Sequence, residues 1–291
     1  MANDLIKTVA VLGAGTMGNG IAHVLARSGY RVILRDVEKR FLDRALETIS
    51  KNLDREIQKG KIGDAHKSEI LARIQPVTDH NALNGADFVV EAVSEQRELK
   101  FRVLREADAS LGPGVILASN TSSISITDLA AHTSRPDRFI GMHFMNPVPV
   151  MKLVEVIRGL ATSDTTFQKT ISLCEKLGKT PVAVNDAPGF VSNRVLMPMI
   201  NEAAFAVMEG VATPEAVDEI MKLGMNHPMG PLELADLIGL DVCVEILDVL
   251  QKGLGDPKYR ACPLLRKYVA AGWLGRKSER GFYKYGARTV P

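Results

Sequence analysis

The chain has 291 residues, of which 46% are hydrophobic and 24% are charged. A domain typically holds roughly 150 residues, so this length predicts two domains. The composition is that of an ordinary globular chain, which excludes disordered and fibrous proteins. The 36 basic and 34 acidic residues leave a formal charge of +2, which provides no large basic surface for nucleic acid or for an anionic membrane. We therefore predict small-molecule partners, with neither nucleic acid nor membrane among them.

The location of the protein is predicted from its first residues and its cysteines. No apolar stretch approaches the roughly 20 residues of a membrane-spanning helix, and residues 1–9 lack the pattern of an export signal. Cys174, Cys243 and Cys262 are odd in number, and their spacing fits neither a disulfide framework nor a zinc ribbon. We expect a cytoplasmic protein without a metal site, whose cysteines are small buried side chains.

Short apolar runs alternate with helical patterns in the first half of the chain, as is typical of a parallel sheet covered by helices. Two helices, one from Phe41 to Ile57 and one at 64–73, are predicted between the second and third strands. The predicted strands are 9–12, 30–36, 88–93, 115–119 and 139–144, followed by 151–157.

From Pro188 onward the patterns are almost wholly helical, which places a domain boundary near Ala187. We predict one domain at 1–186 and an all-α domain at 187–291. The helix that starts at Phe190 carries an apolar surface broad enough to face both its own domain and a second subunit, so we expect a homodimer. The predicted helices are 190–209, 213–222, 232–250 and 263–271.

A glycine-rich loop directly follows the first strand and opens a helix. Gly13, Gly15 and Gly18 have the G-x-G-x-x-G spacing, with Thr16 and Met17 between the last two. Gly13 permits the tight turn, Gly15 lets the backbone approach a pyrophosphate, and Gly18 allows close packing, so phosphate would lie at the helix N-terminus. This context predicts a Rossmann-type, mostly parallel sheet that binds a dinucleotide.

The second strand ends at Asp36, 18 residues after Gly18. A carboxylate at that place accepts hydrogen bonds from the adenosine ribose and repels a 2′-phosphate, which favours NAD over NADP. Arg31 and Arg35 flank Asp36, and Arg35 is interpreted either as a solvated residue or as a neighbour of the adenine. The glycines alone do not exclude a flavin.

Among the six histidines, His143 is the best candidate for a base, because it ends a strand at the carboxyl edge where such sheets bind ligands. A proline-bounded turn and a return strand containing Glu155 follow it. That return could place the carboxylate beside the ring, where it would orient the imidazole and stabilise the imidazolium. The alternative is an isolated histidine, with Glu155 paired elsewhere.

Two further polar positions could hold a substrate. Residues 119–123 follow the fifth strand at the same edge, and Asn193 lies on the helix that opens the second domain. Hydroxyl and amide donors suit a carbonyl oxygen that gains charge. For most of the serine and threonine side chains, however, we expect that they cap the helix at 125–131.

Four longer motifs follow one another: SNTSS at 119–123, HFMNPVPVMKLVE at 143–155, DAPGFVSNR at 186–194 and HPMGPLELAD at 227–236. With the glycine loop and the ending GFYKY at 281–285, they make the chain resemble the L-3-hydroxyacyl-CoA dehydrogenases, and within that family the stand-alone bacterial 3-hydroxybutyryl-CoA dehydrogenases. The resemblance covers essentially the whole chain. Met145 departs from it, since the family usually has phenylalanine there.

The resemblance implies roles for individual residues. His143 is the base, Glu155 is its partner, and Ser122 and Asn193 contact the substrate at the catalytic centre. The alternative is that Glu95 and Lys100 are ordinary charges at the start of a helix and that Lys277 is a solvated residue. For coenzyme A, Lys59 is carried over from a basic group on the first long helix. The residues implied to lie near NAD, besides Asp36, are Glu95, Lys100, Ser122, Asn146 and Lys277.

The resemblance implies the reversible, NAD-dependent oxidation of a (3S)-3-hydroxyacyl-CoA, with a short acyl chain, to the 3-oxoacyl-CoA in fatty acid metabolism. One rival is a related dehydrogenase of a free hydroxy acid such as carnitine. Another is a non-catalytic nucleotide-binding protein like the lens crystallins. The 3-hydroxyisobutyrate and 6-phosphogluconate dehydrogenases use a lysine in the interdomain helix, where this chain has Asn193 and Asn201.

Overall fold

A computed structural model describes residues 6–286 of the chain. The chain divides between Ala187 and Pro188 into two compact units, a sheet unit and a helical unit. Each unit has its own buried apolar core. None of the described helices is both long and apolar enough to span a membrane.

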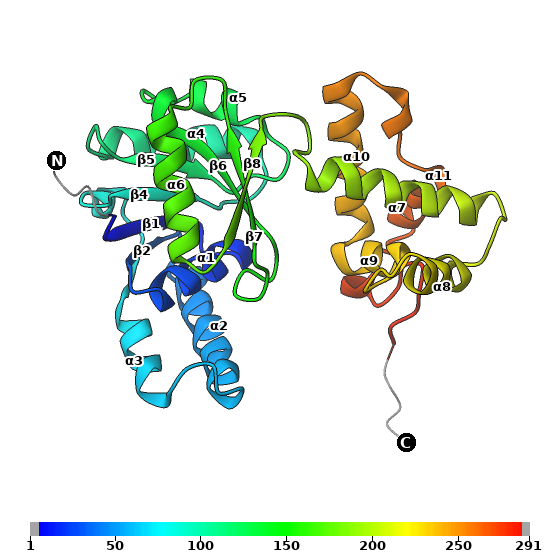
Figure 1. The fold of residues 1–291 in the computed structure, drawn as a ribbon, viewed down its shortest axis with the longest axis horizontal. Helices are drawn as coiled ribbons and strands as arrows, with labels where there is room; N and C mark the ends of the chain where they lie inside the picture. The colour runs from blue at the N-terminus through cyan, green and yellow to red at the C-terminus, as the bar shows by residue number, and fades with distance from the viewer. Residues whose placement is uncertain (1–5, 287–291) are drawn as a thin grey trace. The chain divides into compact units, whose positions relative to one another are not determined.

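The sheet unit is built on eight strands in the order β3-β2-β1-β4-β5-β6-β7-β8 (Figure 1). Most of the strands are almost wholly buried, which explains why apolar runs predicted them. The strands are β1 (Thr8–Leu12), β2 (Arg31–Arg35), β3 (Ile74–Val77), β4 (Phe88–Glu91), β5 (Ile116–Ser119), β6 (Phe139–Phe144), β7 (Leu153–Arg158) and β8 (Thr180–Asn185).

Six strands, β1 to β6, run parallel, whereas β7 is antiparallel to β6, and β8 is parallel to β7. A parallel return needs a crossover of a dozen or more residues, and the connection at 145–152 is too short for one. The predicted mostly parallel Rossmann-type sheet is therefore confirmed, with a reversal at one edge. Because of that reversal, β7 and β8 begin at the edge where β1 to β6 end.

Helices cover both faces of the sheet. Helices α1, α2 and α6 share one core with β1, β2 and β6, while α4 and α5 lie on the opposite face (Figure 1). The amphipathic pattern of α2 buries Leu42, Ala45, Ile49 and Leu53, in agreement with the predicted helix there. The helices of this unit are α1 (Thr16–Arg27), α2 (Lys39–Gln58), α3 (Asp64–Ala72), α4 (Arg97–Ser110), α5 (Ile126–Ala131) and α6 (Asp164–Lys176).

The helical unit packs its helices around a core that contains Ile200, Leu232 and Leu247. Thr213 caps one of them by accepting a hydrogen bond from the amide of Ala216, directly before the proline at the first helical position. The helices are α7 (Ser192–Met208), α8 (Pro214–Gly224), α9 (Pro231–Ile238), α10 (Leu240–Leu254) and α11 (Pro263–Ala270).

The single helix predicted at 232–250 is wrong. Gly239 has φ +108°, a conformation that ends α9 and turns the chain into α10. The elements β3, β8 and α6 were not predicted, and α4 was anticipated only as a helix start near Glu95 and Lys100. The strand β8 is largely exposed at the sheet edge, so it lacks the apolar run that marked the buried strands.

Candidate active site

His143 and Glu155 lie directly opposite each other on β6 and β7. The ring nitrogen Nδ1 is 2.8 Å from the carboxylate oxygen Oε2, and both side chains are buried. A carboxylate can only accept a hydrogen bond, so Nδ1 carries the hydrogen and Nε2 is the basic nitrogen. The pairing suggested by the sequence is thus present, and the alternative of an isolated histidine is wrong.

The glycine loop has the geometry that its spacing predicted. Gly13 adopts φ +99°, and its amide donates to the carbonyl of Arg35 over 2.8 Å. A Cβ on Gly18 would lie 1.8 Å from the carbonyl oxygen of Gly13, so only glycine lets α1 start this close to the loop. A Cβ on Gly15, by contrast, would meet nothing within 4 Å. The loop therefore has open space at Gly15, in front of the N-terminus of α1, where Thr16 and Met17 form the first turn.

The Asp36 carboxylate lies against the same loop. Its Oδ2 accepts a hydrogen bond from the amide of Ala14 at 2.6 Å, and its Oδ1 one from the amide of Val37 at 2.7 Å. Arg31 is exposed, but Arg35 is buried, so the interpretation of Arg35 as a solvated residue is wrong. Burial lowers the pKa of the Arg35 guanidinium from its ordinary value, while the nearby carboxylates of Glu106, Asp36 and Asp79 act in the opposite direction.

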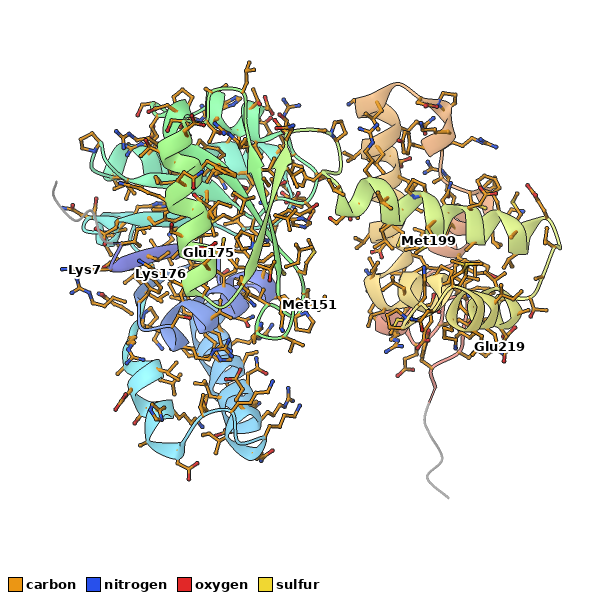
Figure 2. The ribbon with its side chains drawn as sticks, viewed as in Figure 1. Lys7, Met151, Glu175, Lys176, Met199 and Glu219 are labelled. Atoms are coloured by element: carbon orange, nitrogen blue, oxygen red, sulfur yellow. The ribbon has the colours of Figure 1, made fainter. Side chains whose placement is uncertain are left out.

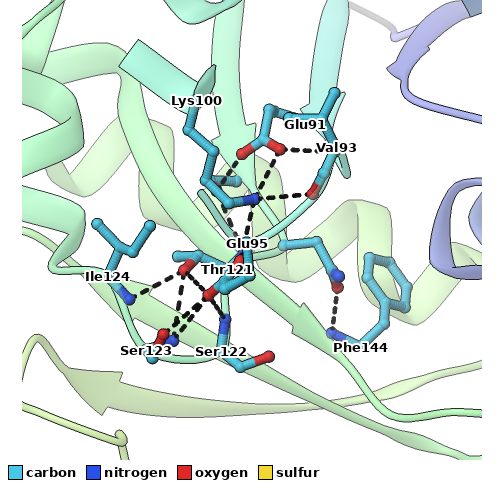
Figure 3. A network of polar contacts seen from close by, with 11 residues as sticks. Glu91, Val93, Glu95, Lys100, Thr121, Ser122, Ser123, Ile124 and Phe144 are labelled. Atoms are coloured by element: carbon cyan, nitrogen blue, oxygen red, sulfur yellow. Dashed lines mark hydrogen bonds and ion pairs between the residues drawn. The ribbon is translucent and has the colours of Figure 1, made fainter. Parts of the chain in front are cut away.

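A buried ionic network joins the carboxyl ends of β4 and β5 to α4 (Figure 3). The Lys100 ammonium donates to Glu91 over 2.8 Å and to the carbonyl of Val93 over 3.2 Å, and it lies 3.2 Å from Glu95. Ser119 donates to the other oxygen of Glu91 at 2.6 Å. Lys100 is almost fully buried, so it is no ordinary solvated charge of a helix start.

Glu95 holds the loop that contains Ser122 (Figure 3). Its Oε1 accepts hydrogen bonds from the Thr121 hydroxyl at 2.5 Å and from the amides of Ser122 and Ser123 at 2.8 and 3.1 Å. Burial raises the pKa of the Glu95 carboxyl, but Lys100 and these hydrogen bonds lower it more, so the net pKa lies below its ordinary value. Glu95 is therefore a charged anchor for the loop.

The prediction that most of the residues at 119–123 cap α5 is wrong. Ser125 caps this helix, and Asp186 accepts hydrogen bonds from the Ser125 hydroxyl and from the amides of Ile126 and Thr127. The serine and threonine side chains upstream bind Glu91 and Glu95 instead. Sequence reasoning also missed Glu91, although a glutamate that ends the apolar run at 88–91 was a usable signal.

A cavity of about 450 Å³ opens beside the glycine loop, between α1, α2 and the connection from β6 to β7. The glycine loop lines it with Ala14, Gly15 and Thr16, and Asn146 lines it from the connection. Across the cavity α2 presents the polar side chains of Arg44, Thr48 and Asn52. Lys59 directly follows α2 and is exposed, but it does not belong to the lining.

The other predicted site residues lie in the helical unit. Asn193 is buried in the first turn of α7. Lys277 lies in a short 3₁₀ segment (Arg276–Ser278), where its ammonium donates to Asp241 over 2.6 Å, so it is paired instead of merely solvated. A larger cavity of about 640 Å³ in this unit is lined mainly by acidic and tyrosine side chains and contains none of the predicted site residues.

Comparison with known proteins assigns a family to both units. Residues 8–187 match the model of the 3-hydroxyacyl-CoA dehydrogenase NAD binding domain, and residues 189–285 match that of the 3-hydroxyacyl-CoA dehydrogenase C-terminal domain.

Individual relatives match this chain over nearly the whole length of both proteins. A probable 3-hydroxybutyryl-CoA dehydrogenase of Bacillus subtilis is 57% identical over 98% of this chain and 99% of the relative, and the 3-hydroxybutyryl-CoA dehydrogenase of Bradyrhizobium diazoefficiens is 54% identical over 99% and 98%. The crystal structure of (S)-3-hydroxybutyryl-CoA dehydrogenase from Ralstonia eutropha has a TM-score of 0.95 at 53% identity, covering 97% of this chain and 100% of that one. The chain therefore belongs to the 3-hydroxyacyl-CoA dehydrogenase family.

Proposed function

We propose that the protein catalyses the reversible, NAD-dependent oxidation of a (3S)-3-hydroxyacyl-CoA to the 3-oxoacyl-CoA. The observation that carries this proposal is the buried His143–Glu155 pair at the sheet edge where the glycine loop also lies. The names of the relatives favour a short acyl chain, with 3-hydroxybutyryl-CoA as the substrate.

His143 acts as the base in this proposal. Its Nε2 takes the proton of the 3-hydroxyl group, while Glu155 keeps the hydrogen on Nδ1 and stabilises the imidazolium that forms. Bound NAD would supply the acceptor for the hydride from C3. In the reverse direction the imidazolium returns its proton to the oxygen of the 3-oxo group. Ser122 and Asn193 are the proposed substrate contacts that the resemblance implies, and their hydroxyl and amide groups are suitable hydrogen-bond donors.

The described residues fit NAD. The open space at Gly15 and the N-terminus of α1 suit a pyrophosphate, and the Asp36 carboxylate beside the loop suits a ribose with two free hydroxyl groups. Glu95, Lys100, Ser122, Asn146 and Lys277 are the further proposed contacts. Glu95 and Lys100 also stabilise the loop at 121–123, so part of their contribution is to hold Ser122 in place.

The part of this cavity that α2 lines, away from the space at Gly15, is the proposed site for part of coenzyme A. Arg44 supplies a positive charge for its phosphates, and Thr48 and Asn52 supply hydrogen-bonding groups. Lys59, directly after the C-terminus of α2, supplies a further exposed charge. Fatty acid metabolism and a cytoplasmic location stay predictions.

We also propose that the protein is a homodimer formed through the helical unit. Solvent-exposed apolar side chains favour burial against a partner, and the predicted apolar surface of α7 contributes to this set. The exposed large apolar residues in the described part of this unit are Val191, Val195, Met208, Val211, Ile220, Leu223, Met225 and Leu237.

The oxidation of NADH upon addition of acetoacetyl-CoA tests the activity, with NADPH and free acetoacetate in parallel. We expect rapid turnover with NADH alone and none with the free acid. His143→Gln and Glu155→Gln should lower kcat by about 10² or more, with little change in NADH affinity. His66→Gln, at an exposed histidine, is the matched control. Turnover of free hydroxy acids only would favour the rival function of a dehydrogenase that acts on a free hydroxy acid such as carnitine. Binding of NADH without any turnover would favour a non-catalytic nucleotide-binding protein.

A further inference from the structure

The connection between β6 and β7, here called the 145–152 loop, joins the strand of His143 to the strand of Glu155. Its residues Asn146, Pro147, Val148 and Pro149 form one wall of the cavity beside the glycine loop. Inside the loop, the amides of Val150 and Met151 donate to the carbonyl of Pro147 over 2.9 and 3.0 Å. The shape of this wall thus depends on how a short stretch of backbone is held.

Lys179, which directly precedes β8, holds this loop through hydrogen bonds to its backbone. Its ammonium donates to the carbonyl oxygens of Val148 at 2.5 Å and of Met151 at 2.7 Å, and the residue is only 7% exposed. Figure 2 shows Met151 in the loop between β6 and β7. Hydrogen bonds from a charged donor are about twice as strong as neutral ones, so this contact fixes both ends of the turn.

The opposite side of the loop packs on α1. A Cβ on Gly20 would lie 2.9 Å from the Cβ of Val148, so the glycine is what allows the loop to approach the helix. The cavity wall is therefore held from two directions, by the Lys179 ammonium and by the surface of α1.

The titratable groups that affect Lys179 come from α1 and α6. Burial and the Arg27 guanidinium of α1 lower the pKa of Lys179 to about 8, and Cys174 of α6 acts in the opposite direction. Arg27 donates to Glu56 of α2 over 2.8 Å, and His23 of α1 lies 3.6 Å from the same carboxylate. The Arg27–Glu56 ion pair between α1 and α2 thus lies close enough to Lys179 for Arg27 to affect its pKa.

We propose that Lys179 is a positioning residue for substrate binding, which fixes the 145–152 loop as a wall of the site that receives the acyl-CoA. This inference rests on the proposed function. His143 and Glu155 stay aligned through the pairing of β6 with β7, which does not involve Lys179. Loss of the ammonium should therefore weaken substrate binding far more than it slows the chemical step.

Lys179→Met tests this prediction, because it keeps the length of the side chain and removes the ammonium. We expect KM for 3-hydroxybutyryl-CoA to rise about tenfold or more, with kcat within about threefold of the wild type. Lys179→Arg, which keeps a charged donor, should return KM to within about threefold. Lys176→Met, at an exposed lysine of α6 (Figure 2), is the matched control and should leave both constants unchanged.

A purely structural role would lower the amount of folded enzyme, and hence the apparent kcat, without raising KM. A KM for Lys179→Met within about twofold of the wild type would overturn the proposal.

Hydrogen exchange at the amides of Val150 and Met151 provides a readout that does not need activity. Exchange should become at least about tenfold faster in Lys179→Met. If the wild type shows no dehydrogenase activity, the proposed function fails while this exchange still tests the loop. Gly20→Ala, which pushes on Val148 from the other side, should also speed exchange at both amides even if Lys179→Met does not fold. Unchanged exchange in folded Lys179→Met would contradict the role of Lys179, and unchanged exchange in Gly20→Ala would contradict the packing of the loop on α1.

Discussion

His23 is a buried histidine that shows how a single residue sets the response of the fold to acid. The side chain on α1 is 0% exposed, and neither ring nitrogen has a hydrogen-bond partner among residues 6–286. Burial lowers the pKa of His23 to about 4, although Glu56 acts in the opposite direction. In the unfolded chain the same imidazole takes up its proton near pH 6.5.

This difference makes stability fall with acidification. Between about pH 6.5 and pH 4 the unfolded state binds a proton that the folded state does not, so the free energy of unfolding decreases as the pH falls through this window. The contribution is full above pH 6.5 and is lost toward pH 4, by at most about 3 kcal/mol. We predict that His23→Leu makes urea unfolding less dependent on pH over this range.

The comparison is between the slopes of stability against pH, because His23→Leu also changes packing at every pH. His66→Leu, at an exposed position of α3, should keep the slope of the wild type. An unchanged slope in His23→Leu would show that the buried ring takes up its proton in the folded protein as it does in the unfolded chain.

Single residues also mark the limit of what the sequence predicts about the site. The His143–Glu155 pair was predictable, since a short turn between two consecutive strands brings their facing residues together. The role of Glu91 was not, because its partners Lys100 and Ser119 come from a helix and from another strand. Such a network depends on tertiary packing, which residue spacing does not specify.

At the scale of elements, the glycine loop before α1 contains one glycine that we expect to matter for binding alone and one that we expect to matter for stability as well. A Cβ on Gly15 meets nothing within 4 Å, and its backbone has φ −67°, which any residue adopts. We predict that Gly15→Ala keeps the thermal stability of the wild type but weakens NADH binding about tenfold or more, because the methyl group occupies the space of the pyrophosphate. Calorimetry of unfolding and fluorescence titration with NADH measure the two effects.

Gly18→Ala is the contrasting variant in the same loop. Its Cβ would collide with the carbonyl oxygen of Gly13, so this variant should lose stability as well as binding. If Gly15→Ala bound NADH as the wild type does, the open space at Gly15 would not be where the pyrophosphate lies.

The predicted elements were most accurate where burial was complete. The strands β1 and β6 were marked by apolar runs because neither face meets water. The edge strand β8 was missed because most of its residues are exposed, so it has no apolar run. The break between α9 and α10 depends on the conformation of one glycine inside a continuous apolar pattern. The helical periodicity continues across this glycine, so the sequence predicted a single helix at 232–250.

At the scale of the whole molecule, the exposed apolar side chains of the helical unit lead to a prediction about assembly. Leu223 on α8 is 79% exposed and Val195 on α7 is 67% exposed. Such side chains gain stability when a second subunit removes them from water, by about 25 cal/mol for each Å² of apolar surface that is buried. We predict that the protein sediments at twice the 31.6 kDa of the chain at micromolar concentration.

Leu223→Glu should shift this equilibrium toward the monomer, because a charge in an apolar interface loses its hydration without a partner. Leu160→Glu is the matched control, since Leu160 is 91% exposed but lies in the sheet unit, and this variant should remain dimeric. Sedimentation velocity across a concentration series distinguishes the two variants. A wild type that stays monomeric at all concentrations would refute the dimer, and dissociation by Leu160→Glu alone would move the interface to the sheet unit.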